Sequence, residues 1–282
     1  MTFDPAPPAP GVVVPRPAAT VMVVRDRRYG FEVLMLRRNV EAAFVGGAHV
    51  FPGGAVDPTD GAAEVAACCT GRDDAEASVV LGLESGGLAY WVAAVRECFE
   101  EAGLLLAYDA GGSLLSLVEP DAGARFASHR AELNAGRRRL VDICGRERLE
   151  LATDRIHYFA HWITPEGALR RYDTRFFVAA APPDQTPAHD AGETVADVWL
   201  SPDEALARHR RGEIELIFPT IRMLQAIGRF STADELLAAA AALDTVPAVL
   251  PRVVADGRGL RILLPGDPGY DEAAGAPSGD VW

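Results

Sequence analysis

Residues 96–104 read Arg-Glu-Cys-Phe-Glu-Glu-Ala-Gly-Leu, and this stretch decides the fold. It continues a segment from residue 88 whose apolar residues recur at helical spacing, which predicts a helix over 88–102 with Gly103 just beyond its end. Side chains three and four positions apart share one face of a helix, so Glu97, Glu100 and Glu101 form one acidic stripe. Like charges at this spacing destabilise a helix unless a partner neutralises them, and oxygen-preferring cations such as Mg²⁺ or Mn²⁺ are suitable partners. The stripe therefore predicts a metal site, with a solvated acidic surface as the alternative.

The segments around this helix alternate between strand and helix patterns. Strands are expected at residues 20–24, 31–38, 155–163, 171–180 and 195–200. Residues 55–87 and 113–150 separate them and carry small, acidic or helical patterns typical of insertions. A helix after Ser201 and further helices before a C-terminal hairpin complete the pattern, which is typical of an α/β fold.

Composition excludes several classes of protein. The chain has 282 residues, of which 49% are hydrophobic and 24% charged, and its formal net charge is −13. Such a charge argues against nucleic-acid binding and against a polybasic membrane contact. All 27 basic residues are arginine, so Schiff-base lysine enzymes and P-loop NTPases are excluded. The four cysteines form no CxxC pair, and no apolar run is long enough to span a membrane, so a cytoplasmic protein is expected.

The motif resembles the signature of the Nudix hydrolase family, G-x5-E-x7-R-E-U-x-E-E-x-G-U, where U is apolar. Residues 96–104 match every fixed position of its second half. The first half departs from the pattern, because Gly54 is followed by Asp60 in place of glutamate, and 35 residues stand between Asp60 and Arg96 where seven are usual, an insertion of about 28 residues. With residues 51–54, 162–165 and 171–177, this split signature resembles the subgroup related to peroxisomal coenzyme A diphosphatases. The resemblance covers roughly residues 18–230.

The resemblance implies an α/β/α sandwich with a mixed sheet and helical cap insertions. It implies metal-dependent hydrolysis of the pyrophosphate bond of a nucleoside diphosphate derivative, a small-molecule substrate. Glu100, Glu101 and the Gly54 carbonyl would bind Mg²⁺ or Mn²⁺, Glu97 would be a ligand or the general base, and Arg96 would orient a glutamate. Glu193 is a second candidate for the base.

Three arginines are expected to bind the substrate: Arg37, Arg38 and Arg175. Coenzyme A or an acyl derivative, ADP-ribose and a dinucleotide all remain open as substrates. Two other classes of function also remain: a catalytically silent Nudix domain that senses a nucleotide, and a di-iron helical protein. The di-iron fold uses Glu-x-x-His motifs on paired helices, and the chain has none.

The expected domain organisation has three parts. Residues 1–16 form a flexible proline-rich arm, 17–230 form the Nudix domain, and 231–282 form a helix and a hairpin. Insertions at about 61–87 and 108–150 are expected to cap the site, and a homodimer is left open.

Overall fold

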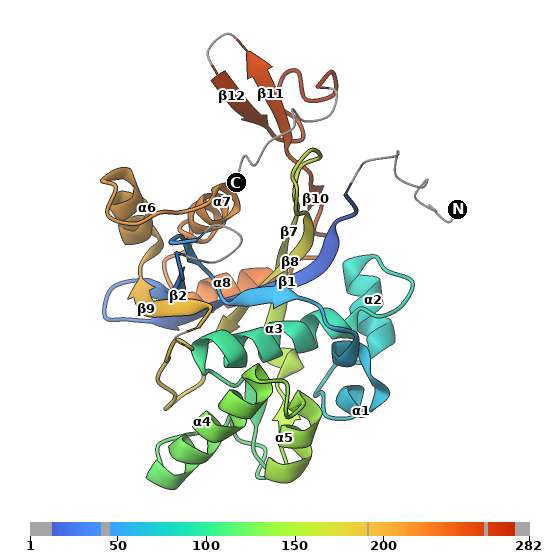
Figure 1. Ribbon diagram of the computed structural model, residues 1–282, viewed down its shortest axis with the longest axis vertical. Helices are drawn as coiled ribbons and strands as arrows, with labels where there is room; N and C mark the ends of the chain where they lie inside the picture. The colour runs from blue at the N-terminus through green and yellow to red at the C-terminus, as the bar shows by residue number, and fades with distance from the viewer. Residues whose placement is uncertain (1–12, 41–45, 191, 257–258, 274–282) are drawn as a thin grey trace.

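A mixed eight-stranded sheet forms the centre of the molecule (Figure 1). The computed structural model describes residues 13–40, 46–190, 192–256 and 259–273. The principal strand order is β10-β7-β8-β1-β2-β3, with β4 paired to β1 and β9 paired to β2. The strands are β1 (Arg16–Asp26), β2 (Phe31–Arg38), β3 (His49–Val50), β4 (Gly53–Ala55), β7 (Ile156–Ile163), β8 (Tyr172–Ala180), β9 (Thr194–Leu200) and β10 (Ala248–Val249).

Strand β1 changes partner along one of its edges. Its last residues pair with β2, whereas Ala18 to Thr20 pair with β4. Its other edge pairs with β8 in parallel along nine residue pairs, from Arg16–Tyr172 to Val24–Ala180. Two strands therefore share this edge of β1, and the Val21 N–H donates to the Pro52 carbonyl between them over 2.9 Å.

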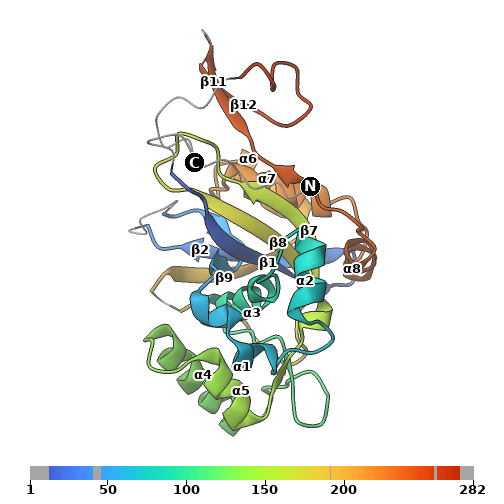
Figure 2. The ribbon, with the colours of Figure 1, turned by 90° about the vertical axis from the view of Figure 1, so that its right-hand side faces the viewer.

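Helices cover both faces of the sheet (Figures 1 and 2). The alternating residues Val21 and Val23 of β1 pack into a core cluster with α3 (Leu88–Ala102). Met22 and Val24 point to the opposite face, where they pack with the three C-terminal helices. These helices are α6 (Pro202–Arg210), α7 (Phe218–Ile227) and α8 (Ala233–Ala241). The predicted α/β/α sandwich with a mixed sheet is confirmed.

Helix α3 has the bounds that the sequence predicts. Twelve of its fifteen residues are buried, including Trp91 and Phe99, which are among the largest fully buried side chains. The helix ends at Gly103, which has φ +70° and donates its N–H to the Phe99 carbonyl. A left-handed backbone position favours glycine, and this explains why the helix stops there.

Both insertions are helical, as expected. The first contains α1 (Ala63–Ala66) and α2 (Asp74–Leu81), and the short helix η1 (Pro58–Gly61) directly precedes it. The second lies between two short strands, β5 (Ala107–Tyr108) and β6 (Glu150–Leu151), and contains α4 (Pro120–Asn134) and α5 (Leu140–Glu147). Helix α4 holds the end of α3, because Arg130 Nε and Asn134 Nδ2 donate to the Glu100 carbonyl over 2.9 and 3.1 Å.

The C-terminal region contains the helix and hairpin that were predicted. Helix α8 is part of the main body, since its residue Leu236 is fully buried in the second core cluster. The hairpin of β11 (Arg252–Asp256) and β12 (Gly259–Leu263) projects from the body (Figure 1). Most of the proline-rich arm, residues 1–12, lies outside the described residues. No helix in the described part of the chain is both long enough and apolar enough to cross a membrane.

Candidate active site

The three glutamates of the predicted stripe are gathered where α3 meets β4. The side chains of Glu97 and Glu100 are 13% and 21% exposed, and Glu101 is 4% exposed as a whole residue. Glu101 Oε2 accepts the backbone N–H of Gly53 over 2.9 Å, which joins the helix to the strand. The acidic stripe therefore faces the sheet, and the alternative of a solvated surface is wrong for these residues.

Arg96 holds the same region together. Its guanidinium donates to one carboxylate oxygen each of Glu97 and Glu100, both over 2.9 Å. It also binds both oxygens of Asp60 over 2.8 and 2.9 Å and donates to the Ala55 carbonyl. Asp60 is only 3% exposed. Asp60, which stands where the family signature has glutamate, thus supplies the carboxylate that holds Arg96 in place.

The Glu97 carboxylate approaches Gly54 closely. A Cβ atom added there would lie 2.4 Å from Oε1 of Glu97, a distance that real Cβ atoms essentially never show. At Gly53 an added Cβ would lie 2.6 Å from the Ala19 carbonyl oxygen. Gly54 therefore lets the Glu97 carboxylate lie directly against β4, and Gly53 lets β4 lie close to β1.

Burial opposes ionisation of all three glutamates. Burial raises the pKa of Glu97 to about 7, although the charge of Arg96 works in the opposite direction. The pKa of Glu101 is raised well above its ordinary value by burial and by the nearby charge of Glu97. Burial also raises the pKa of Glu100, against the effect of Arg96. An added cation would stabilise the ionised form of each group.

The donor set fits a hard divalent cation. Carboxylate and backbone carbonyl oxygens are the ligands that Mg²⁺ and Mn²⁺ prefer. Within the described ranges, no three Asp, Glu, His or Cys side chains are already arranged to hold a metal ion. The reason lies in the hydrogen bonds, because Arg96 engages Glu97 and Glu100 while Gly53 engages Glu101. Metal binding would draw these carboxylates partly away from their present donors.

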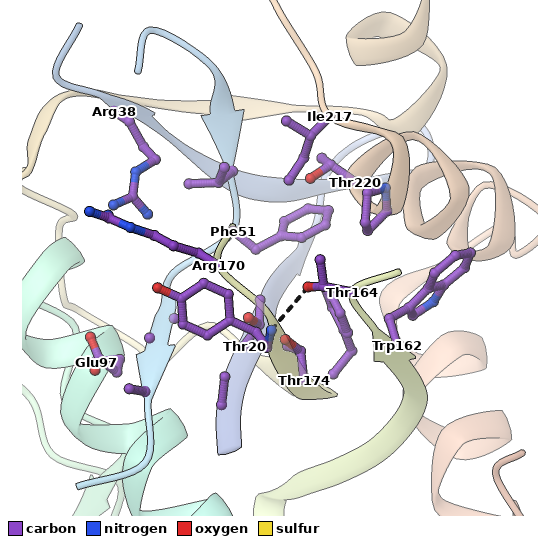
Figure 3. Close-up of a pocket in the computed structure, with 18 of the residues that line it drawn as sticks. Thr20, Arg38, Phe51, Glu97, Trp162, Thr164, Arg170, Thr174, Ile217 and Thr220 are labelled. Carbon is purple, nitrogen blue, oxygen red and sulfur yellow. Dashed lines mark hydrogen bonds between the residues drawn. The ribbon is translucent and has the colours of Figure 1, made fainter. Parts of the chain in front are cut away.

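A cavity of about 580 Å³ opens beside the glutamates, next to the first half of β1 (Figure 3). Four charged side chains line it: Arg38, Glu97, Arg170 and Glu193. Arg38 and Glu193 form an ion pair, and Asp190 accepts the Glu193 N–H over 3.0 Å. In Figure 3, Glu97, Arg38 and Arg170 lie toward the same side of the cavity. The volume lies within the range of small-molecule sites, about 300–1,000 Å³.

Two of the three arginines predicted to bind substrate do not line this cavity. Arg37 is exposed and does not belong to the lining, whereas its neighbour Arg38 does. Arg175 is 4% exposed and lies between Thr174 and Phe176, which do line the cavity. It therefore points to the opposite face, where its guanidinium carbon lies 5.6 Å from the Tyr90 ring centre. Its ion pair with Asp173, 3.2 Å long, is structural.

The prediction that the insertions cap the site is wrong. None of the residues that line the cavity comes from 61–87 or 108–150. Helices α4 and α5 lie on the far side of α3 from the sheet in Figure 1. They pack there because the side of α3 that faces away from the sheet is apolar. It forms one continuous core cluster with the apolar faces of the insertion helices.

Other segments provide lining residues that the sequence analysis did not identify as site residues. They are Thr20 of β1, Phe51 beside β3, Trp162 of β7, Thr164 and Arg170 of the β7–β8 turn, Thr174 of β8, and Ile217 and Thr220 at α7. The motifs at 51–54, 162–165 and 171–177 lie in or beside these segments. They are the feature of the sequence that could have indicated these lining residues.

Comparison with known proteins agrees with the geometry. A family model described as the NUDT19 Nudix domain matches residues 72–227, more than half of the chain. The acyl-coenzyme A diphosphatases NUDT19 of Gallus gallus and Homo sapiens are each 30% identical over 281 residues, which cover 86% of this chain and 73% of the relative. A crystal structure of a NUDIX hydrolase from Alicyclobacillus acidocaldarius superposes with a TM-score of 0.62 at 29% identity, and covers 80% of this chain and 96% of that one. The chain therefore belongs to the Nudix family and is a Nudix hydrolase.

Proposed function

We propose that this protein hydrolyses the pyrophosphate bond of coenzyme A or of an acyl-coenzyme A. The observation that carries the proposal is the meeting of Glu97, Arg38 and Arg170 in one cavity beside Glu100 and Glu101. Carboxylates that attract a divalent cation and arginines that attract phosphate suit a pyrophosphate. The relatives named as acyl-coenzyme A diphosphatases support this choice of substrate.

Glu97, Glu100, Glu101 and the Gly54 carbonyl would hold Mg²⁺ or Mn²⁺. The metal would supply Lewis acidity, which neutralises phosphate oxygens and lowers the pKa of a bound water. Arg96 orients the carboxylates through its bonds to Glu97 and Glu100. This arrangement leaves the protein the tasks of positioning and charge stabilisation.

Two carboxylates are candidates to accept the proton of the attacking water. Glu97 lies against Gly54, whereas Glu193 has a side chain that is 52% exposed and paired to Arg38, and its charge is near enough to raise the pKa of Glu97. Arg38 and Arg170 are the candidate phosphate-binding arginines. The cytoplasmic location and the homodimer remain predictions.

A product assay tests the function. Coenzyme A, acetyl-coenzyme A, ADP-ribose, NADH and diadenosine polyphosphates would each be incubated with the protein and Mg²⁺, Mn²⁺ or EDTA. We expect metal-dependent release of phosphopantetheine or its acyl form together with the adenosine bisphosphate. Preferential cleavage of ADP-ribose or of a dinucleotide would contradict the coenzyme A assignment. Ligand-induced thermal shifts with no turnover of any compound would instead favour the nucleotide sensor.

Replacing Gly54 with alanine should reduce kcat/KM by about 10²-fold, because a displaced Glu97 would lose its reactive geometry. The added methyl group would collide with the Glu97 carboxylate, 2.4 Å away. The matched control is Gly145→Ala in α5, where an added Cβ has no neighbour within 4 Å. Steady-state kinetics should show the loss only in the Gly54 variant, and equal activity of both variants would show that Glu97 has room to move.

A further inference from the structure

The cavity is chemically divided along its length. Glu97, Arg38 and Arg170 lie toward one side in Figure 3, whereas Trp162, Ile217 and Thr220 lie toward the other. Beyond Arg38, Glu97, Arg170 and Glu193, no charged side chain belongs to the lining formed by the described residues. The part of a ligand that reaches Trp162 and Ile217 must therefore be uncharged.

The apolar end is built on the second core cluster. Trp162 and Phe51 are 7% and 3% exposed, so they are packed into the protein even though they line the cavity. The Trp162 ring meets the Phe218 ring edge-on at 6.0 Å, which joins β7 to the start of α7. Ile217 directly precedes this phenylalanine and lines the cavity. Such walls present apolar surface whose position is fixed by packing.

Hydroxyl groups lie between the two ends. Thr20, Thr164 and Thr174 line the middle of the cavity in Figure 3. Thr164 Oγ1 already accepts the Tyr172 N–H over 3.0 Å. A hydroxyl both donates and accepts hydrogen bonds, so this row suits a chain that carries amide groups.

We propose that the apolar end binds the outer pantetheine arm and the acyl chain of an acyl-coenzyme A, and that Ile217 and Trp162 set the chain length that is accepted. The inference rests on the proposed function, since it assumes that the pyrophosphate lies beside Glu97. A flexible arm with two amides followed by an alkyl chain matches the order of surfaces from the glutamates through the threonines to Trp162. A second phosphate or a charged headgroup at that end would lose its solvation without gaining a partner.

Chain-length profiles of three proteins test the inference. Wild type, Ile217→Trp and Ile217→Ala would be assayed with free coenzyme A and with acetyl, butyryl, hexanoyl and decanoyl thioesters. Each methylene that enters the apolar end should raise kcat/KM of the wild type by up to about fourfold, until the cavity is full. The ratio of kcat/KM for decanoyl to free coenzyme A should fall at least tenfold in Ile217→Trp, because the larger side chain fills the site. Ile217→Ala should move the preferred length upward.

The matched control is Leu243→Trp, which places the same bulk at a 45% exposed position after α8 and should leave the profile unchanged. Thermal shifts measured in EDTA provide a readout without turnover, and decanoyl-coenzyme A should stabilise the wild type more than free coenzyme A does. If kcat/KM did not vary with chain length in the wild type or in either Ile217 variant, the inference would be overturned. Cleavage of coenzyme A in the same assay would leave the proposed function intact. Absence of cleavage of every coenzyme A species, with ADP-ribose or a dinucleotide cleaved, would overturn the proposed function and the inference together.

Discussion

Replacing Glu101 with glutamine is expected to reduce kcat/KM by about 10³-fold, the loss of several kcal/mol of metal-dependent charge stabilisation. The fold should survive, because the amide keeps the shape of the side chain and its oxygen can still accept the Gly53 N–H. The neutral amide would hold a divalent cation more weakly than the carboxylate does. Two measurements follow: steady-state turnover with Mg²⁺ or Mn²⁺, and the thermal shift that the same metals produce.

Glu84→Gln provides the control for this experiment. It makes the same chemical change at an exposed position in the loop between α2 and α3. We expect it to keep both the turnover and the metal-induced shift, whereas Glu101→Gln should lose both. Near wild-type turnover in Glu101→Gln would refute its assignment as a metal ligand.

Helix α3, which carries the candidate metal ligands, could be predicted from the sequence because its signals are local. Apolar spacing places Phe99 in the core, and Gly103 ends the helix within one turn of the glutamates. The same spacing puts Glu97, Glu100 and Glu101 on one face. The structure adds that this face is turned toward β4, which depends on the long-range contact of Glu101 with Gly53.

The lining of the candidate cavity could not be predicted in the same way, because its residues come together only through the fold. Arg175 was predicted to bind substrate from its residue type and strand, but its side chain lies on the α3 face with Tyr90. Which face of β8 lines the cavity depends on how β1, β7 and α7 pack beside it, a non-local feature. For the same reason, the sequence could not show that Trp162 and Ile217, which lie more than fifty residues apart, line the same cavity.

The insertions show a different limit of sequence reasoning. Their helical pattern was visible, but they were predicted to cap the site, and none of their residues lines the cavity. The apolar residues Phe126 and Ile143 instead extend the core beneath α3. Burial of apolar surface decided where these helices pack, and a single sequence does not say which exposed surface is available to them.

Replacing Asp60 with alanine is expected to lower the free energy of unfolding by about 3 kcal/mol, because it removes one partner of a buried ion pair. Arg96 would keep its charge but lose two hydrogen bonds of 2.8 and 2.9 Å. Its remaining partners, Glu97 and Glu100, would then be positioned less firmly. Activity should fall by about 10²-fold even under conditions where the variant is fully folded, as expected for a displacement of about 1 Å in the site. Urea unfolding and steady-state kinetics measure the two effects.

Asp73→Ala separates this role from simple helix capping. Asp73 caps α2 as Asp57 caps η1, through a side-chain bond to a backbone N–H, and it does not contact Arg96. Loss of such a cap should lower the free energy of unfolding by about 1 kcal/mol, and the turnover of Asp73→Ala should be unchanged. If Asp60→Ala lost no more stability than Asp73→Ala and kept its activity, Asp60 would be a turn residue only.

A double-mutant cycle completes the argument about the split signature. Asp60→Ala and Arg96→Ala each break the same ion pair, so the combined variant should lose less stability than the sum of the two single losses. Additive losses would mean that the two residues act independently. A positive coupling would explain how the chain tolerates an insertion within its signature. The loop from Gly54 to Asp60 places the buried Asp60 carboxylate against Arg96 before the insertion begins. The contacts that position Arg96 therefore do not depend on the inserted helices, which can pack elsewhere.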